Sequence, residues 1–331
     1  PAEWETHLAT WLSWPKNLLT FPESKLATVE AVYCEMVRAL SYGEKVKILI
    51  ENEEMENKVS RQLEQSEAHM HNIILLKIKS ADVWIRDYSP IFLLNKIGEK
   101  ALVKWNFNAW GGKYDDLLYD DKAGEEVAQV SKAKTFRPNI VLEGGSIDVN
   151  GDGSVLTTEQ CLLHKNRNPS LSRDQIEQYL KDYLNVDKII WLKSGIEGDD
   201  TDGHIDDFAR FVSKKDVLCA FDNASDDENT LVLKKNLELL EKTDFEITKL
   251  PMPKPLVDQA EGRRLPASYA NFYIGNNVVL LPVFGDAKDK EAIAILSGFF
   301  PKREIVPIEA SELVYGYGGI HCVTQQEPKG E

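Results

Sequence analysis

The stretch Ile305-Val-Pro-Ile-Glu309, followed by Val314-Tyr-Gly-Tyr-Gly-Gly-Ile-His-Cys322, contains the pattern that decides the fold. Its first part is short and apolar, as expected of a buried strand. The second part is a glycine-rich loop that ends at a cysteine, and glycines let a backbone close tightly around a ligand. Just before the strand, apolar side chains at helical spacing predict a helix at 288–299. One helix, one strand and one loop therefore form a unit.

This helix–strand–loop unit recurs along the chain. Similar helices are predicted at 121–132, 172–184 and 228–242, and each precedes a short apolar strand. Near the start, helices at 24–42 and 53–67 flank a strand at 46–50. The expected strands of the repeated units begin near five isoleucines: Ile73, Ile140, Ile189, Ile247 and Ile305. Such regular spacing indicates an internally repeated α/β architecture.

A loop rich in acidic residues or glycine, or one ending in asparagine, follows each expected strand. If the strand ends face a common axis, the five loops meet there, so one radially built domain over residues 1–331 explains the chain better than two halves. No Pro/Ser-rich or low-complexity linker offers a boundary. The loops contain Asp82–Pro90, Glu143–Gly145, Gly198–Asp207, Ser268–Asn271 and Val314–Cys322.

Composition narrows the classes of function. The apolar content of 43% is enough for a sizeable core, and no apolar run reaches the roughly 18 residues of a membrane span. The first residues lack a signal-peptide pattern, so a cytoplasmic protein is expected. A formal charge of −15 argues against nucleic acid, which needs clustered Lys and Arg, and is compatible with a small cationic substrate.

Cys322 is the candidate nucleophile. A thiolate is the attacking form of cysteine, and a free thiol is mostly protonated at neutral pH, so such a cysteine needs help from its surroundings. The alternative is a small buried hydrophobic residue after a turn. The other cysteines, Cys34, Cys161 and Cys219, have apolar neighbours and no metal or redox spacing, so they are predicted to be structural.

Two other loops carry candidate partners for that thiol. Asp87 follows Trp84 by three residues, and a carboxylate beside an indole suits a planar cation, although an ordinary core tryptophan fits as well. His204 and Asp206 alternate in what reads as an extended segment, which would place both side chains on one face. The alternative for this pair is a surface loop.

Residues 148–159 match the calcium-loop pattern of an EF-hand. That motif needs a helix on each side, whereas the apolar residues around it favour strands and Asn150-Gly151 favours a hairpin turn. We therefore interpret residues 140–163 as a hairpin, and a calcium-binding module at 148–159 is a remote alternative.

The order of the motifs resembles one family, the agmatine deiminases and bacterial-type peptidyl-arginine deiminases, which belong to the guanidino-group modifying enzymes. The likeness covers nearly the whole chain and implies the pentein fold, a five-bladed α/β propeller around a central active site. Its motifs are Trp84-x-x-Asp87, Glu143-Gly-Gly, Asp200-Thr-Asp-Gly-His204-x-Asp206 and His321-Cys322-x-Thr-Gln-Gln.

The resemblance also implies a mechanism. Asp87 and Asp206 would hold the guanidinium while Trp84 covers its face, Cys322 would attack its carbon, and His204 would act as acid and then as base. The resemblance calls for no metal or organic cofactor. Further substrate-binding candidates, some with an alternative role beside His204, are Glu143, Asp200, Asn271 and Gly319.

His321 is not assigned as the base, because neighbours in an extended strand point to opposite faces. Two departures from the family pattern, at Tyr88-Ser89 and at Tyr317 with Gly319, lie beside the reactive groups and bear on pocket shape.

The leading prediction is hydrolysis of agmatine to N-carbamoylputrescine and ammonia, as in putrescine biosynthesis. Agmatine is cationic at both ends, and the acidic run 197–207 would suit its distal amine. The alternatives are a peptidyl-arginine or free-arginine deiminase with the same chemistry, and a Cys/His hydrolase of amide bonds. The oligomeric state stays open, a homo-oligomer included.

Overall fold

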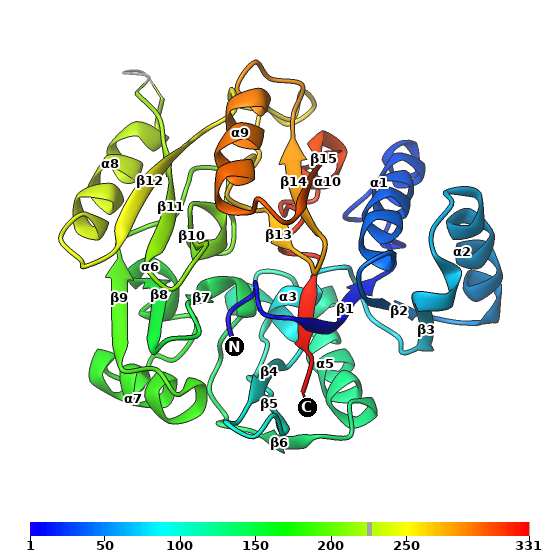
Figure 1. Cartoon of the computed structure of the whole chain (residues 1–331), viewed down its shortest axis with the longest axis horizontal. Coiled ribbons are helices and arrows are strands. Elements are labelled where there is room, and N and C mark those ends of the chain that lie inside the picture. The colour runs from blue at the N-terminus through cyan, green and yellow to red at the C-terminus, as the bar shows by residue number, and fades with distance from the viewer. Residues whose placement is uncertain (224–226, 331) are drawn as a thin grey trace.

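A computed structural model describes residues 1–223 and 227–330, and five separate sheets surround a common centre (Figure 1). Four sheets have three strands and one has four. The four-stranded sheet contains β16 (Gln325–Pro328), β1 (His7–Ser13), β2 (Lys45–Ile50) and β3 (Ile73–Lys77). The three-stranded sheets contain, first, β4 (Ile91–Leu94), β5 (Lys100–Val103) and β6 (Lys134–Phe136), and second, β7 (Ile147–Val149), β8 (Ser154–Thr158) and β9 (Lys188–Leu192). The other two contain β10 (Ala209–Phe211), β11 (Asp216–Phe221) and β12 (Glu246–Pro251), and β13 (Tyr273–Ile274), β14 (Val278–Val283) and β15 (Glu304–Glu309).

Each sheet is one blade with the same connection. An antiparallel pair is followed by a parallel pair, and a helix on the outside joins the two parallel strands, as in β11-α8-β12. The four-stranded sheet has a second parallel pair, β2 and β3, joined by a second helix. Parallel strands need such a crossover, which explains the repeated helix–strand spacing of the sequence. The long helices are α1 (Glu23–Ser41), α2 (Glu53–Gln65), α5 (Asp120–Val130), α7 (Arg173–Leu184), α8 (Asn229–Leu240) and α9 (Asp289–Phe299).

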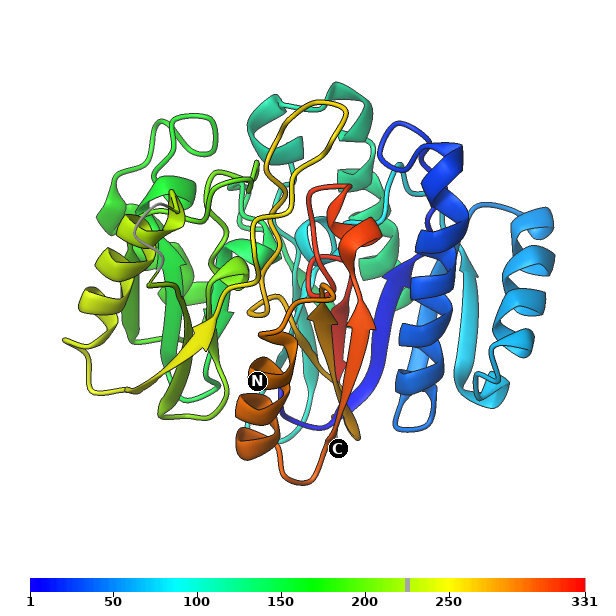
Figure 2. The same cartoon turned by 90° about the horizontal axis from the view of Figure 1, so that it is seen from above.

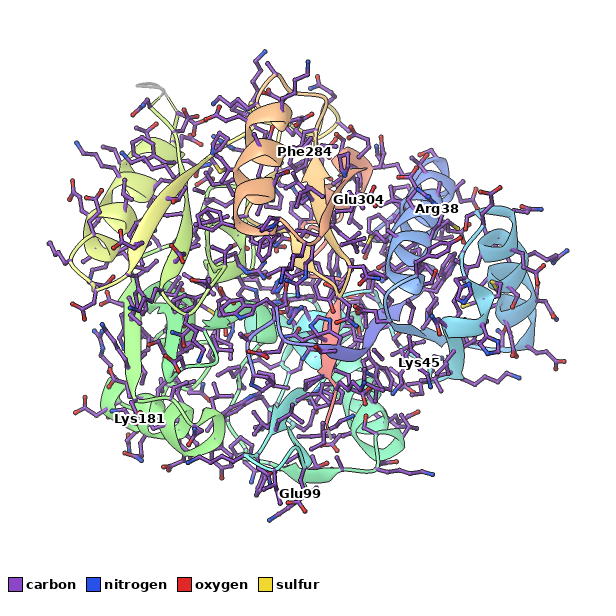
Figure 3. All side chains as sticks on the ribbon, in the orientation of Figure 1. Arg38, Lys45, Glu99, Lys181, Phe284 and Glu304 are labelled. Carbon is purple, nitrogen blue, oxygen red and sulfur yellow. The ribbon has the colours of Figure 1, made fainter. Side chains whose placement is uncertain are left out.

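The ring is closed by the two ends of the chain. β16 pairs antiparallel with β1, so the last strand completes the blade that the first strand begins. The pseudo-fivefold α/β propeller predicted from the sequence is thereby confirmed. Exposed charged side chains such as Arg38, Glu99 and Lys181 lie on the outer elements (Figure 3). No helix in the described part of the chain is long and apolar enough to cross a membrane.

The prediction of a strand that begins near Ile140 is wrong. Val141 makes only an isolated bridge to Asn106, and β6 takes the place of the expected strand. The side chain of Asn168 explains this, because it accepts from the N–H of Val141 at 2.9 Å and donates to its carbonyl at 2.8 Å. A side chain thus satisfies the backbone groups that a neighbouring strand would otherwise bind.

The hairpin expected within 140–163 is present as β7 and β8, although Cys161 lies in the short helix α6 (Glu159–Leu162) and not in a strand. The groups that a calcium ion would need are engaged elsewhere. Asp148 accepts from the N–H of Phe211 at 2.6 Å, and Glu159 pairs with Lys193 at 2.6 Å.

Short helical turns carry the central loops. They are α3 (Ile85–Tyr88), α4 (Ala109–Gly112) and α10 (Ser311–Val314), together with the 3-10 turns η2 (Asp115–Leu117), η3 (Gly144–Ser146) and η4 (Ile205–Asp207). A further 3-10 turn, η1 (Met70–Asn72), stands between α2 and β3. Figure 2 shows the segment between β12 and β13, in gold, reaching over the same end of the molecule as the red loop that precedes β16.

Candidate active site

A cavity of about 310 Å³ opens where the loops of several blades meet. Its inner end contains Cys322, Asp87 and Trp84, and its outer end contains Asp200 and Arg263. Residues from different blades therefore converge on one space, as the radial arrangement predicts. The remaining lining includes Leu19, Thr20, Trp110, Tyr114, Asp116, Leu117, Thr201, Glu261, Tyr315, Gly316, Tyr317 and Gly318.

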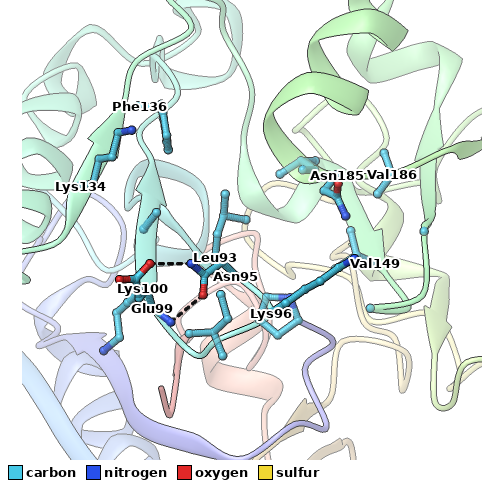
Figure 4. A pocket seen from close by; sticks show the side chains of 16 residues that line it. Leu93, Asn95, Lys96, Glu99, Lys100, Lys134, Phe136, Val149, Asn185 and Val186 are labelled. Atoms are coloured by element: carbon cyan, nitrogen blue, oxygen red, sulfur yellow. Dashed lines mark hydrogen bonds between the residues drawn. The ribbon is translucent and has the colours of Figure 1, made fainter. Parts of the chain in front are cut away.

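A larger cavity, of about 850 Å³, lies elsewhere, between the blade of β4–β6 and the blade of β7–β9 (Figure 4). Apolar side chains such as Phe136 and Val149 line it together with Lys96, Lys100 and Lys134. Its described lining contains neither cysteine nor histidine. The chemistry therefore belongs to the smaller cavity.

Cys322 is buried and surrounded by hydrogen-bond donors and acids. Its Sγ lies 3.3 Å from Nδ2 of Asn271 and 3.4 Å from the backbone nitrogen of Gly319, both of which can donate to a thiolate. Oδ2 of Asp206 lies 4.0 Å away. Burial raises the pKa of Cys322 well above its ordinary value, and the charges of Asp206, Asp207 and Asp87 raise it further. A bound cation would favour the thiolate here.

Asp87 lies in α3 and lines the same cavity. Its Oδ2 accepts from Nε1 of Trp110 and its Oδ1 accepts from the N–H of Gly145, each at 2.9 Å. Burial raises the pKa of Asp87 to about 6, against the opposing charge of His204. A Cβ on Gly145 would lie 2.6 Å from Nδ1 of His204 and 2.9 Å from Oδ1 of Asp87, so this approach requires glycine.

The loop that carries His204 and Asp206 is not extended, and that expectation is wrong. Residues 205–207 form the 3-10 turn η4, and His204 precedes its first residue. Nevertheless both side chains reach the centre. Nδ1 of His204 lies 3.8 Å from Oδ1 of Asp87. Nε2 of His204 and Oδ1 of Asp206 are buried and have no hydrogen-bond partner among the described residues.

Glu143 lies behind His204. Its Oε1 accepts from Nε of Arg167 at 2.6 Å, its Oε2 is 4.0 Å from Sγ of Cys161, and its side chain is fully buried. Although burial alone would lower it, the pKa of His204 is raised well above its ordinary value by Asp87, Cys161 and Glu143. Of the two roles considered for Glu143, support of the histidine fits this position and contact with a distal amine does not.

Asp200 and Asn271 lie at opposite ends of the site. Asp200 lines the outer cavity and accepts a hydrogen bond from the hydroxyl of Tyr114, whereas Asn271 donates to Asp207 at 2.9 Å as well as to the thiol. The second of the two departures from the family pattern lies at this site. Tyr317, with a positive φ of 74°, lines the cavity, and Gly319 leaves space that the side chain of Asn271 fills.

His321 has a different environment from the one expected. Its segment is a turn and not a strand, and its ring lies between Asp206 and Glu3. The sequence interpretation also missed Trp110, Tyr114 and Arg263. No short motif marks these three, because each lies in a segment between the loops that carry the catalytic motifs.

A five-bladed α/β propeller with cysteine, histidine and carboxylates converging at its axis is the pentein arrangement. A model of the Porphyromonas-type peptidyl-arginine deiminase family matches residues 1–328, and the chain belongs to this family. The family that the sequence motifs predict is therefore confirmed.

Individual relatives agree with this assignment. The agmatine deiminase of Pseudomonas aeruginosa strain UCBPP-PA14 is 38% identical over 355 residues, covering 99% of this chain and 95% of that protein. The structure of C. jejuni agmatine deiminase with a cysteine-to-serine substitution and substrate bound has a TM-score of 0.91 and 33% identity, covering 100% of this chain and 96% of that one. The agmatine deiminase of Enterococcus faecalis has a TM-score of 0.91 and 34% identity, covering 99% and 95%.

Proposed function

We propose that this chain is an agmatine deiminase that converts agmatine and water to N-carbamoylputrescine and ammonia. One observation carries the proposal: Oδ2 of Asp206 lies 4.0 Å from Sγ of Cys322, and that thiol and Asp87 line the same cavity, whose outer end is acidic. The similarity to agmatine deiminases over 99% of the chain supports the same substrate.

The guanidinium binds between the two carboxylates. Its planar N–H groups match carboxylate oxygens in pairs, and burial strengthens each charge-assisted bond. Trp84, which lines the cavity, covers the face of the cation. The positive charge of the substrate also offsets the acids that disfavour the thiolate of Cys322.

The first half of the reaction forms a covalent bond. As the cation binds, the thiol of Cys322 releases its proton to solvent, and the amide of Asn271 and the N–H of Gly319 hold the sulfur. The thiolate then attacks the guanidinium carbon. His204 gives its proton to the leaving nitrogen, the C–N bond breaks, and ammonia departs. An S-alkylthiouronium intermediate remains.

The second half releases the product. Water donates a proton to the now neutral His204 and adds to the same carbon, and the C–S bond then breaks. The hydroxyl group of the adduct loses its proton to solvent as the carbonyl forms, so the neutral ureido product leaves and the thiolate returns. One water is consumed for each ammonia released. All these steps use residues of this chain, and residues 1–331 act as one catalytic unit because every blade contributes to the centre.

The outer cavity selects the substrate tail. Asp116, Asp200 and Glu261 line it, and Tyr114 orients Asp200 by hydrogen bonding. An ammonium at the end of a four-carbon tail is stabilised there. A carboxylate beside the amine, as in free arginine, meets this acidic surface and is disfavoured.

The test measures ammonia and ureido product with agmatine, free arginine and a blocked arginine peptide. Agmatine is expected to give the highest kcat/KM, and Cys322→Ala is expected to abolish turnover of all three. Preference for the peptide or for arginine would overturn the substrate assignment, whereas turnover by Cys322→Ala would overturn the mechanism.

A further inference from the structure

The ring of His321 connects the N-terminal segment to the candidate substrate-binding carboxylate. Its Nδ1 lies 2.6 Å from Oδ2 of Asp206, and its Nε2 lies 2.8 Å from Oε2 of Glu3. All three side chains are at most 5% exposed. Glu3 is separated from His321 by 318 positions, so the contact exists only because the ring of blades is closed.

Both neighbours of this ring are acceptors when ionised. Because each ring nitrogen faces a carboxylate, the protonated ring of His321 would donate to both neighbours at once. The acids agree with this arrangement. Although burial opposes it, Arg210 and His321 hold the pKa of Glu3 well below its ordinary range, and a hydrogen bond from His321 lowers the pKa of Asp206 in the same way.

Glu3 itself is fixed from several sides. Its Oε1 accepts from Nη2 of Arg210 at 3.0 Å and from the N–H of Ile274 at 2.8 Å, and its Oε2 lies 3.4 Å from Nη2 of Arg86. A carboxylate with this many partners has one orientation. The imidazole that it holds is therefore fixed as well.

The two oxygens of Asp206 consequently differ. Oδ2 is engaged by His321, whereas Oδ1 is buried and has no partner in the described part of the structure. A carboxylate free to rotate would exchange these positions. The hydrogen bond from His321 opposes this rotation, so Oδ1 stays the oxygen that is available to a donor.

We propose that Glu3 and His321 are positioning residues that fix the orientation and the negative charge of Asp206, so that its free oxygen binds the guanidinium. Neither residue touches the substrate. This inference rests on the proposed function for its catalytic consequence, and on the geometry alone for the hydrogen-bonded chain Glu3–His321–Asp206.

The first test compares two neutralised acids in the same buried cluster. Glu3→Gln keeps the side-chain shape and weakens the hold on His321, and kcat/KM for agmatine is expected to fall about 10- to 100-fold, mainly through KM. Asp148→Asn is the matched control, because Asp148 also lies beside Arg210 but makes no hydrogen bond to His321. The control is expected to lose thermal stability to a similar degree and keep wild-type kinetics. Equal kinetic losses in both variants would overturn the positioning role.

The second test separates the two ends of the imidazole. In His321→Asn the amide nitrogen replaces Nδ1 and can still donate to Asp206, whereas in His321→Gln it replaces Nε2 and reaches Glu3 only. The asparagine variant is therefore expected to keep a kcat/KM about tenfold above that of the glutamine variant. The reverse order would contradict the proposal.

Proton NMR of the imidazole N–H region tests the chain without any substrate. Two strongly downfield protons are expected for His321 in the wild-type protein, and both should vanish in His321→Gln. Glu3→Gln should shift the one bound to Glu3. If the wild-type protein shows these signals but does not consume agmatine, the proposed function is wrong and the hydrogen bonds Glu3–His321–Asp206 are supported. If agmatine is consumed but the signals are missing, the positioning role of Glu3 and His321 is wrong and the proposed function is retained.

Discussion

Nδ1 of His204 lies 3.8 Å from Oδ1 of Asp87, and both side chains are buried beneath the same cavity. This distance suits an ion pair between imidazolium and carboxylate. Burial alone would lower the pKa of His204, but Asp87 raises it well above its ordinary value. In the free enzyme His204 is therefore protonated and can give its proton to the leaving nitrogen.

His204→Gln removes this proton donor and keeps the volume. We expect kcat for agmatine to fall about 10²- to 10⁴-fold, because proton transfer by a positioned side chain contributes on that scale. KM should not rise, since the carboxylates that bind the cation remain. Ammonia release measures both constants. His164→Gln, outside the described cavity lining, is the control and should behave as wild type. A His204→Gln enzyme with more than a tenth of the wild-type kcat would contradict the role.

Cys322 should react slowly as a free thiol at neutral pH. Burial and three nearby acids raise its pKa well above the ordinary range, so the thiolate fraction increases only as pH rises toward that value. Alkylation by iodoacetamide, followed at Cys322 by peptide mass spectrometry, is therefore expected to accelerate without a plateau through pH 9. A plateau near pH 7 would indicate a stable thiolate in the free enzyme.

Most of the fold follows from local sequence patterns. The crossover helices α5, α7, α8 and α9 lie within two residues of their predicted ranges, because apolar side chains at helical spacing have to face a sheet. The strand at Ile140 is the exception. Ile140 and Leu142 are buried as expected, but the side chain of Asn168 binds the backbone of Val141, and no local pattern reveals such a partner.

The site was predictable only in part, for the same reason. Asp87, His204, Asp206 and Cys322 stand in recognisable motifs, and the structure brings them together. The function of His321 depends on Glu3, at the other end of the chain. Contacts between distant segments are determined by the closure of the ring, which single-sequence periodicity does not encode.

Arg263 should weaken the binding of agmatine. Its Cζ lies 3.3 Å from the centre of the Tyr317 ring, in the outer cavity where the distal ammonium would bind. Arg263→Ala is expected to lower KM for agmatine about two- to fivefold, because a half-exposed charge acts at this scale, and added salt should reduce the difference. Lys254→Ala removes an equal charge from the same segment outside the described lining and is the control. A higher KM in Arg263→Ala would show instead that Arg263 helps to hold the substrate.

Asp120 should make stability fall as pH rises toward 8. It is the first residue of α5 and accepts from the N–H of Asp82 at 3.0 Å, and burial raises its pKa to about 8. Between about pH 4 and pH 8 the folded protein holds a proton that the unfolded chain has released, so the free energy of unfolding declines as pH rises. Thermal unfolding should give a Tm that decreases from pH 6.5 to 8.5, with a smaller slope in Asp120→Asn. Identical slopes would mean that Asp120 titrates normally.

Gly319 keeps the thiol and its donor together. A Cβ at this position would lie 2.4 Å from Oδ1 of Asn271. That amide cannot move freely, because it also binds Asp207 at 2.9 Å and the N–H of His321 at 2.8 Å. Gly319→Ala is therefore expected to displace the amide from Sγ and lower kcat at least about tenfold, while Tm changes by only a few degrees.

The control for this variant is Gly298→Ala. Gly298 lies within α9 with no atom within 4 Å of an added Cβ, so alanine should raise stability slightly and leave kcat unchanged. A Gly319→Ala enzyme with wild-type kcat would mean that the hydrogen bond from Asn271 to sulfur does not matter for the attack. In that case the N–H of Gly319, 3.4 Å from Sγ and retained in the variant, would be the donor that holds the thiolate.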